Sequence, residues 1–239
     1  MAKFAPAAAP RTIALGDVHG CGDALATLID GLQLTPQDVV VVLGDVVDRG
    51  PQSREALQML LELGERTQLV CILGNHEQMM LEAVEGRIPV QEWLMHGGAA
   101  TLDSYGKGFG VDGIAPEHLD FVRTWGDVYE TPGHFFVHGN YVASRPLATQ
   151  PWTDLRWQSL KWHTPGVHVS GKTAVLGHTS NKQGLIVNLG HIVCIDTFAC
   201  GGFWLTALDA TTGRVWQSNQ EGELRTGELP PIQSMASVK

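Results

Sequence analysis

The chain has 239 residues, of which 44% are hydrophobic and 17% charged, and its formal net charge is −9. This length allows one α/β domain or two small ones, with enough apolar residues for a sizeable core. The acidic balance, without a cluster of lysine or arginine, argues against a nucleic-acid-binding protein, and no apolar run is long enough to cross a membrane.

The N-terminal half reads as repeated strand–turn–helix units. Residues 1–11, rich in alanine and proline, lack an apolar signal core, and we expect a flexible arm on a cytoplasmic protein. Short β-branched runs at 12–15, 39–43 and 69–73 predict buried strands. Apparent helices follow them at 21–31, 51–64 and 76–86. Such units predict a parallel sheet with helices on its faces.

The turns after these three runs carry polar and charged side chains. They are Asp17 and His19 after the first run, Asp45, Asp48 and Arg49 after the second, and Asn75 and His76 after the third. In parallel sheets ligands bind outside the carboxyl ends of the strands. We therefore expect these side chains to meet at one edge of the sheet.

The remaining chain predicts a side lobe, two more strands with polar ends, and a second sheet. Residues 77–126 look helical and would lie beside the site, and apolar runs lead directly into His138 and His178. Residues 12–220 are expected to form one domain, and the polar residues 221–239 a loose tail. Apolar runs that alternate with turns predict an antiparallel second sheet, at 185–187, 192–195, 203–208 and 214–216.

These positions supply the donor atoms of a two-metal hydrolase. Carboxylate, imidazole and amide oxygen suit manganese, iron or zinc, and a bridging carboxylate can hold two ions about 3.5–4 Å apart. Two ions neutralise phosphate and turn water into hydroxide. Arginine matches phosphate oxygens with a fork of donors, and a histidine outside the metal site can protonate the leaving group.

The motifs resemble the phosphoprotein-phosphatase branch of the calcineurin-like metallophosphoesterases, especially its small bacterial and phage serine/threonine phosphatases. The pattern GDxHG, GDxxDRG, GNHE, HG and GHT is complete between Gly16 and Thr179. The resemblance implies an α/β fold, a metallophosphoesterase β-sandwich of two mixed sheets built from βαβ units, flanked by helices and a helical side lobe. It also implies two divalent metal ions, with manganese preferred and iron or zinc as alternatives.

The resemblance further implies a role for each motif residue. A hydroxide between the metals would attack phosphorus, while His76, oriented by Asp48, would act as general acid and Arg49 would bind the phosphate. The implied metal ligands are Asp17, His19 and Asp45 for the first ion, and Asp45, Asn75, His138 and His178 for the second. Asp45 would bridge the two ions, and Asn75 would also contact substrate.

Two departures concern the phosphate-binding arginines. Many members of the family carry an arginine directly before GNHE, where this chain has Leu73. Members also place an arginine between the last two histidines. The candidates for this substrate-binding role are Arg156 and, after it, Arg145, and neither lies in a matching motif.

Several residues have a structural interpretation. Four scattered cysteines favour reduced, packed thiols over a disulfide framework. Glu77 suits the first turn of a helix, where the dipole favours an acid, and we leave it outside the site. Trp152, Trp157 and Trp162 could either pack their long loop against the domain or form an aromatic wall facing the substrate.

The sequence therefore favours a metal-dependent phosphatase for phosphoserine and phosphothreonine proteins or small phosphoesters. The alternative is a symmetric diadenosine-tetraphosphate hydrolase, because that activity uses nearly the same motifs and the tryptophan-rich loop could stack a base. A non-catalytic phosphate-binding protein fits less well, because every ligand and the general acid are present. We expect no nucleic-acid or membrane partner, and the oligomeric state stays open.

Overall fold

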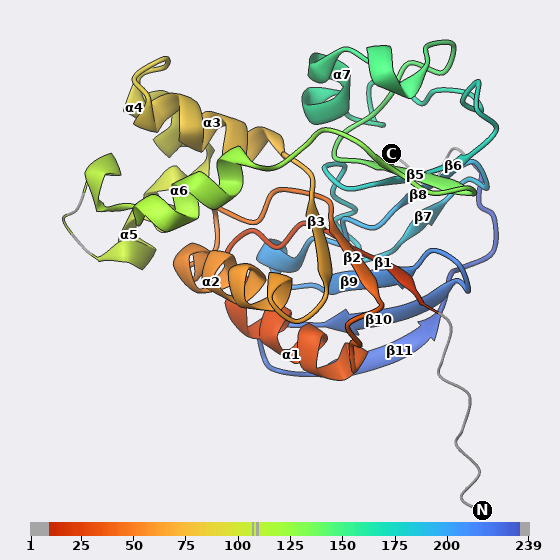
Figure 1. The fold of residues 1–239 in the computed structure, drawn as a ribbon, viewed down its shortest axis with the longest axis horizontal. Helices are drawn as coiled ribbons and strands as arrows, with labels where there is room; N and C mark the ends of the chain where they lie inside the picture. Colours follow the sequence, from red (N-terminus) through yellow and green to blue (C-terminus); the bar gives the residue numbers. More distant parts are fainter. Residues whose placement is uncertain (1–9, 107, 109, 235–239) are drawn as a thin grey trace, which may run out of the picture.

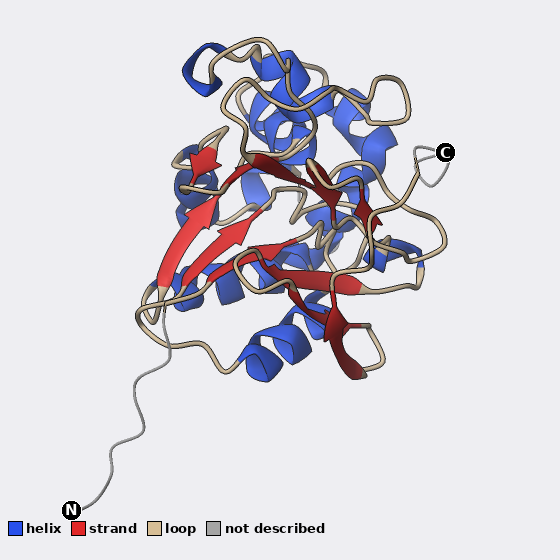
Figure 2. Cartoon of the chain, turned by 90° about the vertical axis from the view of Figure 1, so that its right-hand side faces the viewer, coloured by secondary structure: helices blue, strands red, loops and turns tan. Residues whose placement is uncertain are grey.

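Two β-sheets pack face to face and are flanked by helices, as Figures 1 and 2 show. The computed structural model describes residues 10–106, 108 and 110–234. Of the arm expected over residues 1–11, residues 1–9 lie outside the described part of the chain. The predicted sandwich of two mixed sheets is confirmed.

The first sheet has six strands and contains the three units expected from the N-terminal half. Strands β1, β2 and β3 are parallel neighbours, with Leu15 level with Val42 and Val42 level with Cys71, so their carboxyl ends share one edge. The strands are β1 (Thr12–Leu15), β2 (Val39–Val42), β3 (Gln68–Cys71), β9 (Leu205–Asp209), β10 (Arg214–Ser218) and β11 (Leu224–Glu228), in the order β11-β10-β9-β1-β2-β3.

The second sheet differs from its prediction. It has five strands, and β5, β6 and β8 run parallel. Within the segments predicted to be antiparallel, the pairs β7–β8 and β9–β10 are antiparallel as expected. The segments predicted to form one antiparallel sheet belong to two different sheets. Strand β9 pairs with β1 of the first sheet, whereas β8 pairs with β6 of the second. The strands are β4 (Tyr129–Glu130), β5 (His134–Val137), β6 (Thr173–Leu176), β7 (Val187–Asn188) and β8 (Ile192–Cys194), in the order β4-β5-β6-β8-β7.

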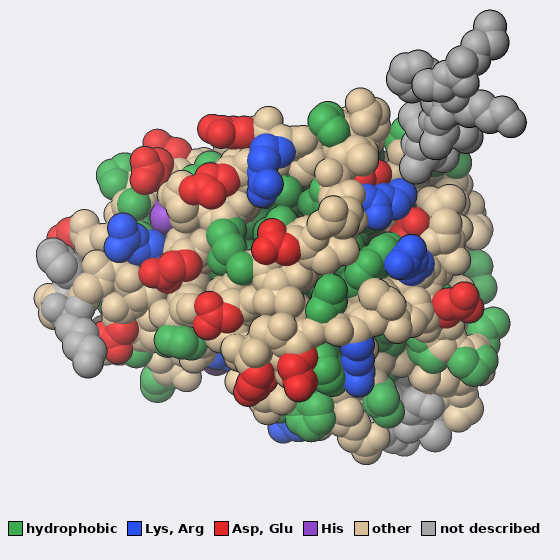
Figure 3. Space-filling model, turned by 90° about the horizontal axis from the view of Figure 1, so that it is seen from below, with side chains coloured by type: hydrophobic (Ala, Val, Ile, Leu, Met, Phe, Trp, Pro, Cys, Tyr) green, Lys and Arg blue, Asp and Glu red, His purple; other side chains and the backbone are tan. Residues whose placement is uncertain are grey.

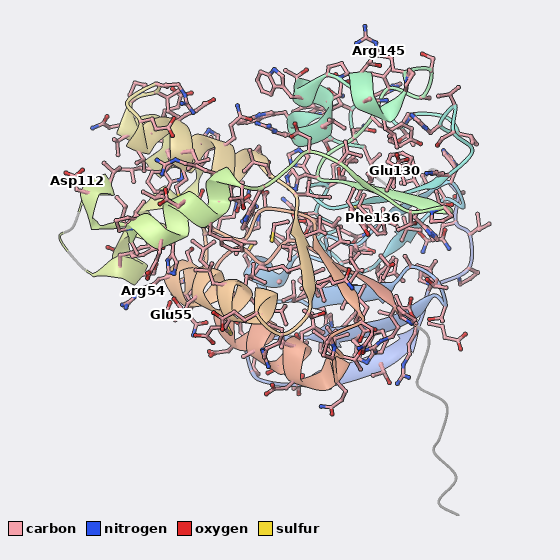
Figure 4. All side chains as sticks on the ribbon, in the orientation of Figure 1. Arg54, Glu55, Asp112, Glu130, Phe136 and Arg145 are labelled. Carbon is pink, nitrogen blue, oxygen red and sulfur yellow. The ribbon has the colours of Figure 1, made fainter. Side chains whose placement is uncertain are left out.

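Alternation along the strands divides the core into layers. Val41 and Phe136 face the space between the sheets, whereas Val40 and Val42 face the helices and Phe135 faces the opposite side. Figure 4 labels Phe136 among these inner side chains. Complete burial of one such side chain contributes about 1.5–3 kcal/mol. The buried valines of β2 therefore join two layers of the core.

Helices α1 and α2 cover the outer face of the first sheet, and the helices of the lobe lie beyond the ends of β1–β3 (Figure 1). The predicted lobe is confirmed as largely helical. The helices are α1 (Gly22–Leu32), α2 (Ser53–Gly64), α3 (Asn75–Val84), α4 (Val90–Trp93), α5 (Ala99–Tyr105), α6 (Pro116–Arg123) and α7 (Trp152–Trp157).

A kink divides the lobe between α4 and α5. The π-helical turn Leu94–Gly98 contains Gly97 at φ 109°, a conformation that favours glycine. A Cβ on Gly97 would also lie 2.9 Å from the backbone nitrogen of Arg49. Glycine at this position therefore lets the lobe approach the turn that carries Arg49.

The C-terminal segment is more ordered than predicted. Within the expected loose tail 221–239, Leu224–Glu228 form β11, which pairs with β10 at the edge of the first sheet. All five residues of β11 are exposed, so the strand lacks the alternating apolar pattern that would have revealed it. Residues 235–239 lie outside the described part of the chain.

Charged side chains of both signs are interspersed on the face seen in Figure 3, so the net negative charge forms no single patch there. Within the described part of the chain, no helix combines the length and apolar character needed to span a bilayer.

A half-buried ion pair anchors the start of β1 far from the motif turns. Asp38 accepts hydrogen bonds from the Arg11 amide and guanidinium at 2.6–3.1 Å, and another from the amide of Thr35 at 2.8 Å. Burial alone would raise the pKa of the Asp38 carboxyl, but these donors lower it well below the usual range. The charged form of Asp38 therefore stabilises the folded chain.

We predict that Asp38→Asn lowers the free energy of unfolding by about 1.5–3 kcal/mol, the scale of a hydrogen bond to a charged group. Because the folded pKa is depressed, the contribution is present above the unfolded value of about 4 and is lost as pH falls below it. Urea unfolding of both chains at pH 7 and at lower pH measures this. Asp120→Asn is the control, since Asp120 is 75% exposed in its pair with Arg123. An equal effect of the two substitutions would contradict the prediction.

Candidate metal centre

The motif turns meet where the two sheets adjoin. Asp17, Asp45 and Asn75 follow β1, β2 and β3 of the first sheet, and His138 and His178 follow β5 and β6 of the second. The amide of His178 donates to the Asp17 carboxylate at 3.0 and 3.1 Å, which ties the end of β6 to the end of β1. The site therefore lies across the boundary between the sheets.

The backbone of these turns is strained. Five of the seven non-glycine residues with positive φ in the described part of the chain belong to the motifs. Such a conformation costs on the order of 1–3 kcal/mol per residue and persists only where the surroundings impose it. The five residues are His19 (44°), Asp45 (49°), Asp48 (73°), Arg49 (70°) and His178 (60°).

Hydrogen bonds to backbone carbonyls orient three imidazole rings. In each ring one nitrogen must carry the proton that the carbonyl accepts, so the other presents its lone pair. Burial lowers the pKa of His19 to about 3 and that of His178 to about 4, which keeps both rings neutral. The bonds join His19 Nδ1 to Val47 O at 2.9 Å, His138 Nδ1 to Leu43 O at 2.7 Å, and His178 Nε2 to Trp157 O at 3.0 Å.

The second nitrogens of the His19 and His138 rings lie beside the Asp45 carboxylate. His138 Nε2 lies 3.3 Å from Asp45 Oδ1, 3.1 Å from Asn75 Oδ1 and 3.2 Å from His178 Nδ1, and His19 Nε2 lies 3.5 Å from Asp45 Oδ2. Carboxylate, amide and imidazole groups gathered in one buried site are an arrangement that a cation would stabilise. The donor set of carboxylate, imidazole and amide oxygen fits divalent first-row metals.

The structure forms two close groups that share Asp45. The ligand atoms of Asp45, His138 and His178 lie within 4.8 Å of one another, as do those of His19, Asp45 and His76. The second group has His76 where the sequence predicted Asp17. Because Nδ1 of His76 is held by Asp48 at 2.7 Å, the assignment of His76 to proton transfer rather than metal binding stays our prediction.

Asp17 belongs to neither close group but contacts the backbone amide of His178. Burial raises the pKa of Asp17 well above its usual value, and the carboxylates of Asp196 and Asp45 raise it further. Three acids close together in a buried site are the environment that a divalent cation neutralises. The predicted metal-binding role of Asp17 is therefore consistent with its electrostatic surroundings.

Arg49, His76 and Asp48 form a connected group beside the cluster. Arg49 donates to His19 Nε2 at 2.7 Å and to His76 Nε2 at 2.9 Å. Burial lowers the pKa of His76, but the Asp45 and Asp48 carboxylates outweigh it and raise the pKa overall. The guanidinium thus lies between the metal cluster and the ring predicted to supply the proton.

Glu77 is a functional residue that the sequence interpretation left out. Its buried carboxylate accepts four backbone N–H groups, and burial and the Asp45 charge raise its pKa to about 7. The sequence holds a signal for this contact, because Glu77 is the third residue of α3, a position from which a glutamate can accept the N–H of the N-cap residue, here Gly74. The four donors are Asp45 N at 2.9 Å, Val46 N at 2.7 Å, Val47 N at 3.1 Å and Gly74 N at 3.1 Å.

Neither arginine proposed from the sequence points freely into the site. Arg156 donates to Asp127 at 2.6 Å and to Gln78 at 3.2 Å, so its charge is already paired at the rim. The Arg145 side chain extends outward into solvent, as Figure 4 shows, and among the described residues its guanidinium has one hydrogen-bond partner, the carbonyl of Thr149 at 3.4 Å. Arg49 is therefore the arginine that the structure places at the cluster.

The tryptophan-rich segment supports the site and also exposes aromatic surface. Trp157 supplies the carbonyl that orients His178, and its indole donates to Gln78 at 3.1 Å. Trp152 and Trp162 are 50% and 79% exposed. Trp157 therefore has the structural role of packing its segment against the domain, while the side chain of Trp162 extends from the surface.

The chain matches the family model of the calcineurin-like phosphoesterases over residues 10–194. A symmetrical bis(5'-nucleosyl)-tetraphosphatase of Pseudomonas fluorescens (strain SBW25) is 45% identical over 73 residues, which cover 30% of this chain and 25% of that protein. Serine/threonine-protein phosphatase 1 of Salmonella typhimurium is 40% identical over 87 residues, or 35% of this chain and 37% of that protein. The chain therefore spans about a quarter to a third of the length of these curated relatives.

A solved structure described as a candidate diadenosine tetraphosphatase superposes with a TM-score of 0.67. The superposition includes 94% of this chain and 96% of the other protein's chain, and the two sequences are 18% identical. Similarity at this level of identity concerns the fold alone.

We predict that Asp45→Asn removes most of the affinity for divalent metal, because it removes the negative charge and one of the two oxygens where the two groups meet. Titration calorimetry with Mn²⁺ and elemental analysis of the purified chain measure the loss. Asp209→Asn is the matched control, since Asp209 is also buried but accepts hydrogen bonds from Thr211 and Thr212 instead. Retention of two ions by Asp45→Asn would contradict the predicted bridging role.

Proposed function

The chain belongs to the calcineurin-like phosphoesterase family, and on that premise we propose that it is a metal-dependent phosphatase. Its proposed substrates are phosphate monoesters, namely phosphoserine and phosphothreonine in proteins or small phosphoesters. The observation that carries the proposal is the convergence of the His138, His178 and Asn75 donor atoms on Asp45, beside the linked Arg49, His76 and Asp48.

The proposed metal ligands are Asp17, His19, Asp45 and Asn75, together with His138 and His178. Divalent ions bound there, with manganese as our first choice, would neutralise phosphate charge and lower the pKa of water. The carbonyls of Val47, Leu43 and Trp157 fix the tautomers of the three rings, so the second nitrogen of each ring is the one left to bind a metal.

Arg49 is the proposed phosphate-binding residue. The two terminal nitrogens of its guanidinium contact His19 and His76. The donors of Arg49 therefore lie beside the group of ligand atoms formed by His19, Asp45 and His76. Phosphate oxygens are stronger acceptors than imidazole and match the fork of guanidinium donors in geometry. Arg49 would therefore orient the ester so that its leaving oxygen lies toward His76.

His76 is the proposed general acid. Its Nδ1 donates to Asp48 at 2.7 Å, which leaves Nε2 on the side of Arg49 and Asp45. In hydrolysis a water oxygen forms the new bond to phosphorus, and the bond from phosphorus to the ester oxygen breaks. The leaving oxygen takes a proton from Nε2, which can carry one once Arg49 has turned its donors from this nitrogen to the phosphate. Asp48 would stabilise the charged ring that carries this proton.

The second candidate is symmetric hydrolysis of dinucleoside tetraphosphates. Lys161 donates to the Ser180 carbonyl at 3.0 Å, and the amide of Leu160 donates to Thr179 at 3.0 Å, so this loop lies against the turn that carries His178. The neighbouring Trp162 is 79% exposed. A cation next to an exposed indole suits a phosphate chain that ends in a stacking base. The names of the matched relatives support this candidate as well.

We predict that His76→Asn keeps its metal ions but loses about 10²–10⁴ in kcat, the usual range for a general acid. The assay is phosphate release from a phosphopeptide with Mn²⁺ and with chelator. His134→Asn is the control, because His134 begins β5 at the end opposite His138. Unchanged turnover in His76→Asn would remove the residue from this role, and metal-independent release by the unaltered chain would refute the proposed function.

We predict that Trp162→Ala raises the KM for diadenosine tetraphosphate by about 5–100-fold if that compound is a substrate, the effect of losing one stacking contact. Hydrolysis of p-nitrophenyl phosphate should stay unchanged. Trp152→Ala is the control, because Trp152 is less exposed than Trp162 and the guanidinium of Arg156 lies 5.8 Å from its ring centroid. Product analysis decides between the candidates, since a chain that forms no ADP is not a symmetric tetraphosphatase.

A further inference from the structure

The helical lobe reaches into the group that surrounds the proposed general acid. Asp48 is 0% exposed, and three side chains donate to its carboxylate. His76 donates at 2.7 Å, Trp93 Nε1 at 2.9 Å and Thr101 Oγ1 at 2.7 Å. Only His76 belongs to the metal-binding motifs, whereas Trp93 ends α4 and Thr101 lies in α5. In Figure 1 these helices lie at the side of the molecule away from α7.

Thr101 makes two complementary hydrogen bonds with the same residue. Its oxygen accepts the N–H of Asp48 at 2.9 Å, and its hydroxyl proton can then go to Asp48 Oδ1 at 2.7 Å. Ser53 at the start of α2 also accepts that N–H at 3.1 Å. Asp48 has a φ of 73°, so these contacts hold a strained backbone in place.

Trp93 is held equally firmly. Its ring is fully buried, and a Cβ on Gly98 would lie 2.5 Å from it, so only glycine fits there. The neighbouring Gly97 accepts the N–H of Arg49 at 3.2 Å. The turn between α4 and α5 thus contacts the backbone of Arg49 while the helices on either side contact the Asp48 carboxylate.

We propose that Trp93 and Thr101 are positioning residues for proton transfer, an inference that rests on the proposed role of His76. The terminal torsion of an aspartate side chain has only a weak preference of its own. Directional donors from two helices fix the plane of the Asp48 carboxylate, and that plane fixes the ring of His76. The lobe thereby sets the direction in which Nε2 delivers its proton.

This role predicts a dependence on the leaving group. Phenyl phosphate releases a basic oxygen that needs a proton as the bond breaks, whereas p-nitrophenyl phosphate releases a stable anion that needs less help. A misaligned proton donor should therefore slow the first substrate more than the second. Damage to metal binding or to folding would slow both substrates alike.

The test compares Trp93→Phe with Trp125→Phe. Both are buried tryptophans of the hydrophobic cluster that includes the lobe, but among the described residues Trp125 Nε1 has no hydrogen-bond partner. We expect Trp93→Phe to lower kcat for phenyl phosphate about tenfold, well inside the range of general-acid catalysis. Its kcat for p-nitrophenyl phosphate, its KM for either substrate and its Mn²⁺ content should stay within about twofold of the unaltered chain, too small a change in the barrier to signal lost catalysis. Trp125→Phe should change none of these.

A second pair of variants covers the case in which Trp93→Phe does not fold. Thr101→Val removes the hydroxyl at constant shape and should reproduce the effect, and Thr101→Ser should restore activity toward phenyl phosphate. Equal slowing of both substrates, equal behaviour of the two tryptophan variants, or failure of Thr101→Ser to rescue would each overturn the inference. Unchanged hydrolysis of phenyl phosphate by His76→Asn would overturn the inference as well, because the inference rests on that residue. The proposed function fails only if the unaltered chain hydrolyses neither substrate with Mn²⁺, or hydrolyses them equally well with chelator, so the two failures are distinguishable.

Discussion

The buried carboxylate of Glu77 holds together the turn on which the candidate site depends. It binds the amides of Asp45, Val46 and Val47 and so fixes the strained backbone that turns Asp45 inward. A carboxylate with four backbone donors is fully satisfied without any charged side chain. The same carboxylate also caps α3, which presents Asn75 and His76. One side chain thus couples the end of β2 to the start of α3, and a small change there would move ligands on both.

The sequence predicts those parts of the molecule that depend on residues close together along the chain. The apolar runs of β1–β3 and the motif residues after them show where strands end, and parallel pairing then brings Asp17, Asp45 and Asn75 to one edge. The lobe's contacts with Asp48 could not be found in this way, because Trp93 and Thr101 lie about fifty residues from Asp48 and have ordinary helical surroundings. Glu77 was missed because a first-turn acid is common for reasons unrelated to any site.

The predictions that the structure contradicts also failed because of contacts between residues far apart in the sequence. Strands β8 and β9 have similar apolar patterns, and only their hydrogen-bond partners assign them to different sheets. Strand β11 is exposed on both faces and so has no periodicity to detect. Arg156 was a reasonable candidate for phosphate binding, but a nearby carboxylate, Asp127, pairs its charge. Each case depends on a neighbour that is distant in sequence, which composition and spacing do not reveal.

The position of the candidate site across the boundary between the sheets also links ligand availability to the lifetime of the fold. A cation bound to Asp45 and His138 would add a strong link between the carboxyl ends of two sheets that otherwise meet through apolar contacts and a few hydrogen bonds. Any ligand that binds only the native chain stabilises it by about 1.4 kcal/mol for each tenfold excess over its Kd. Depletion of that ion in a cell would therefore remove activity and, in the same step, increase the fraction of chains open to proteolysis. The abundance of the protein would then follow the supply of its metal.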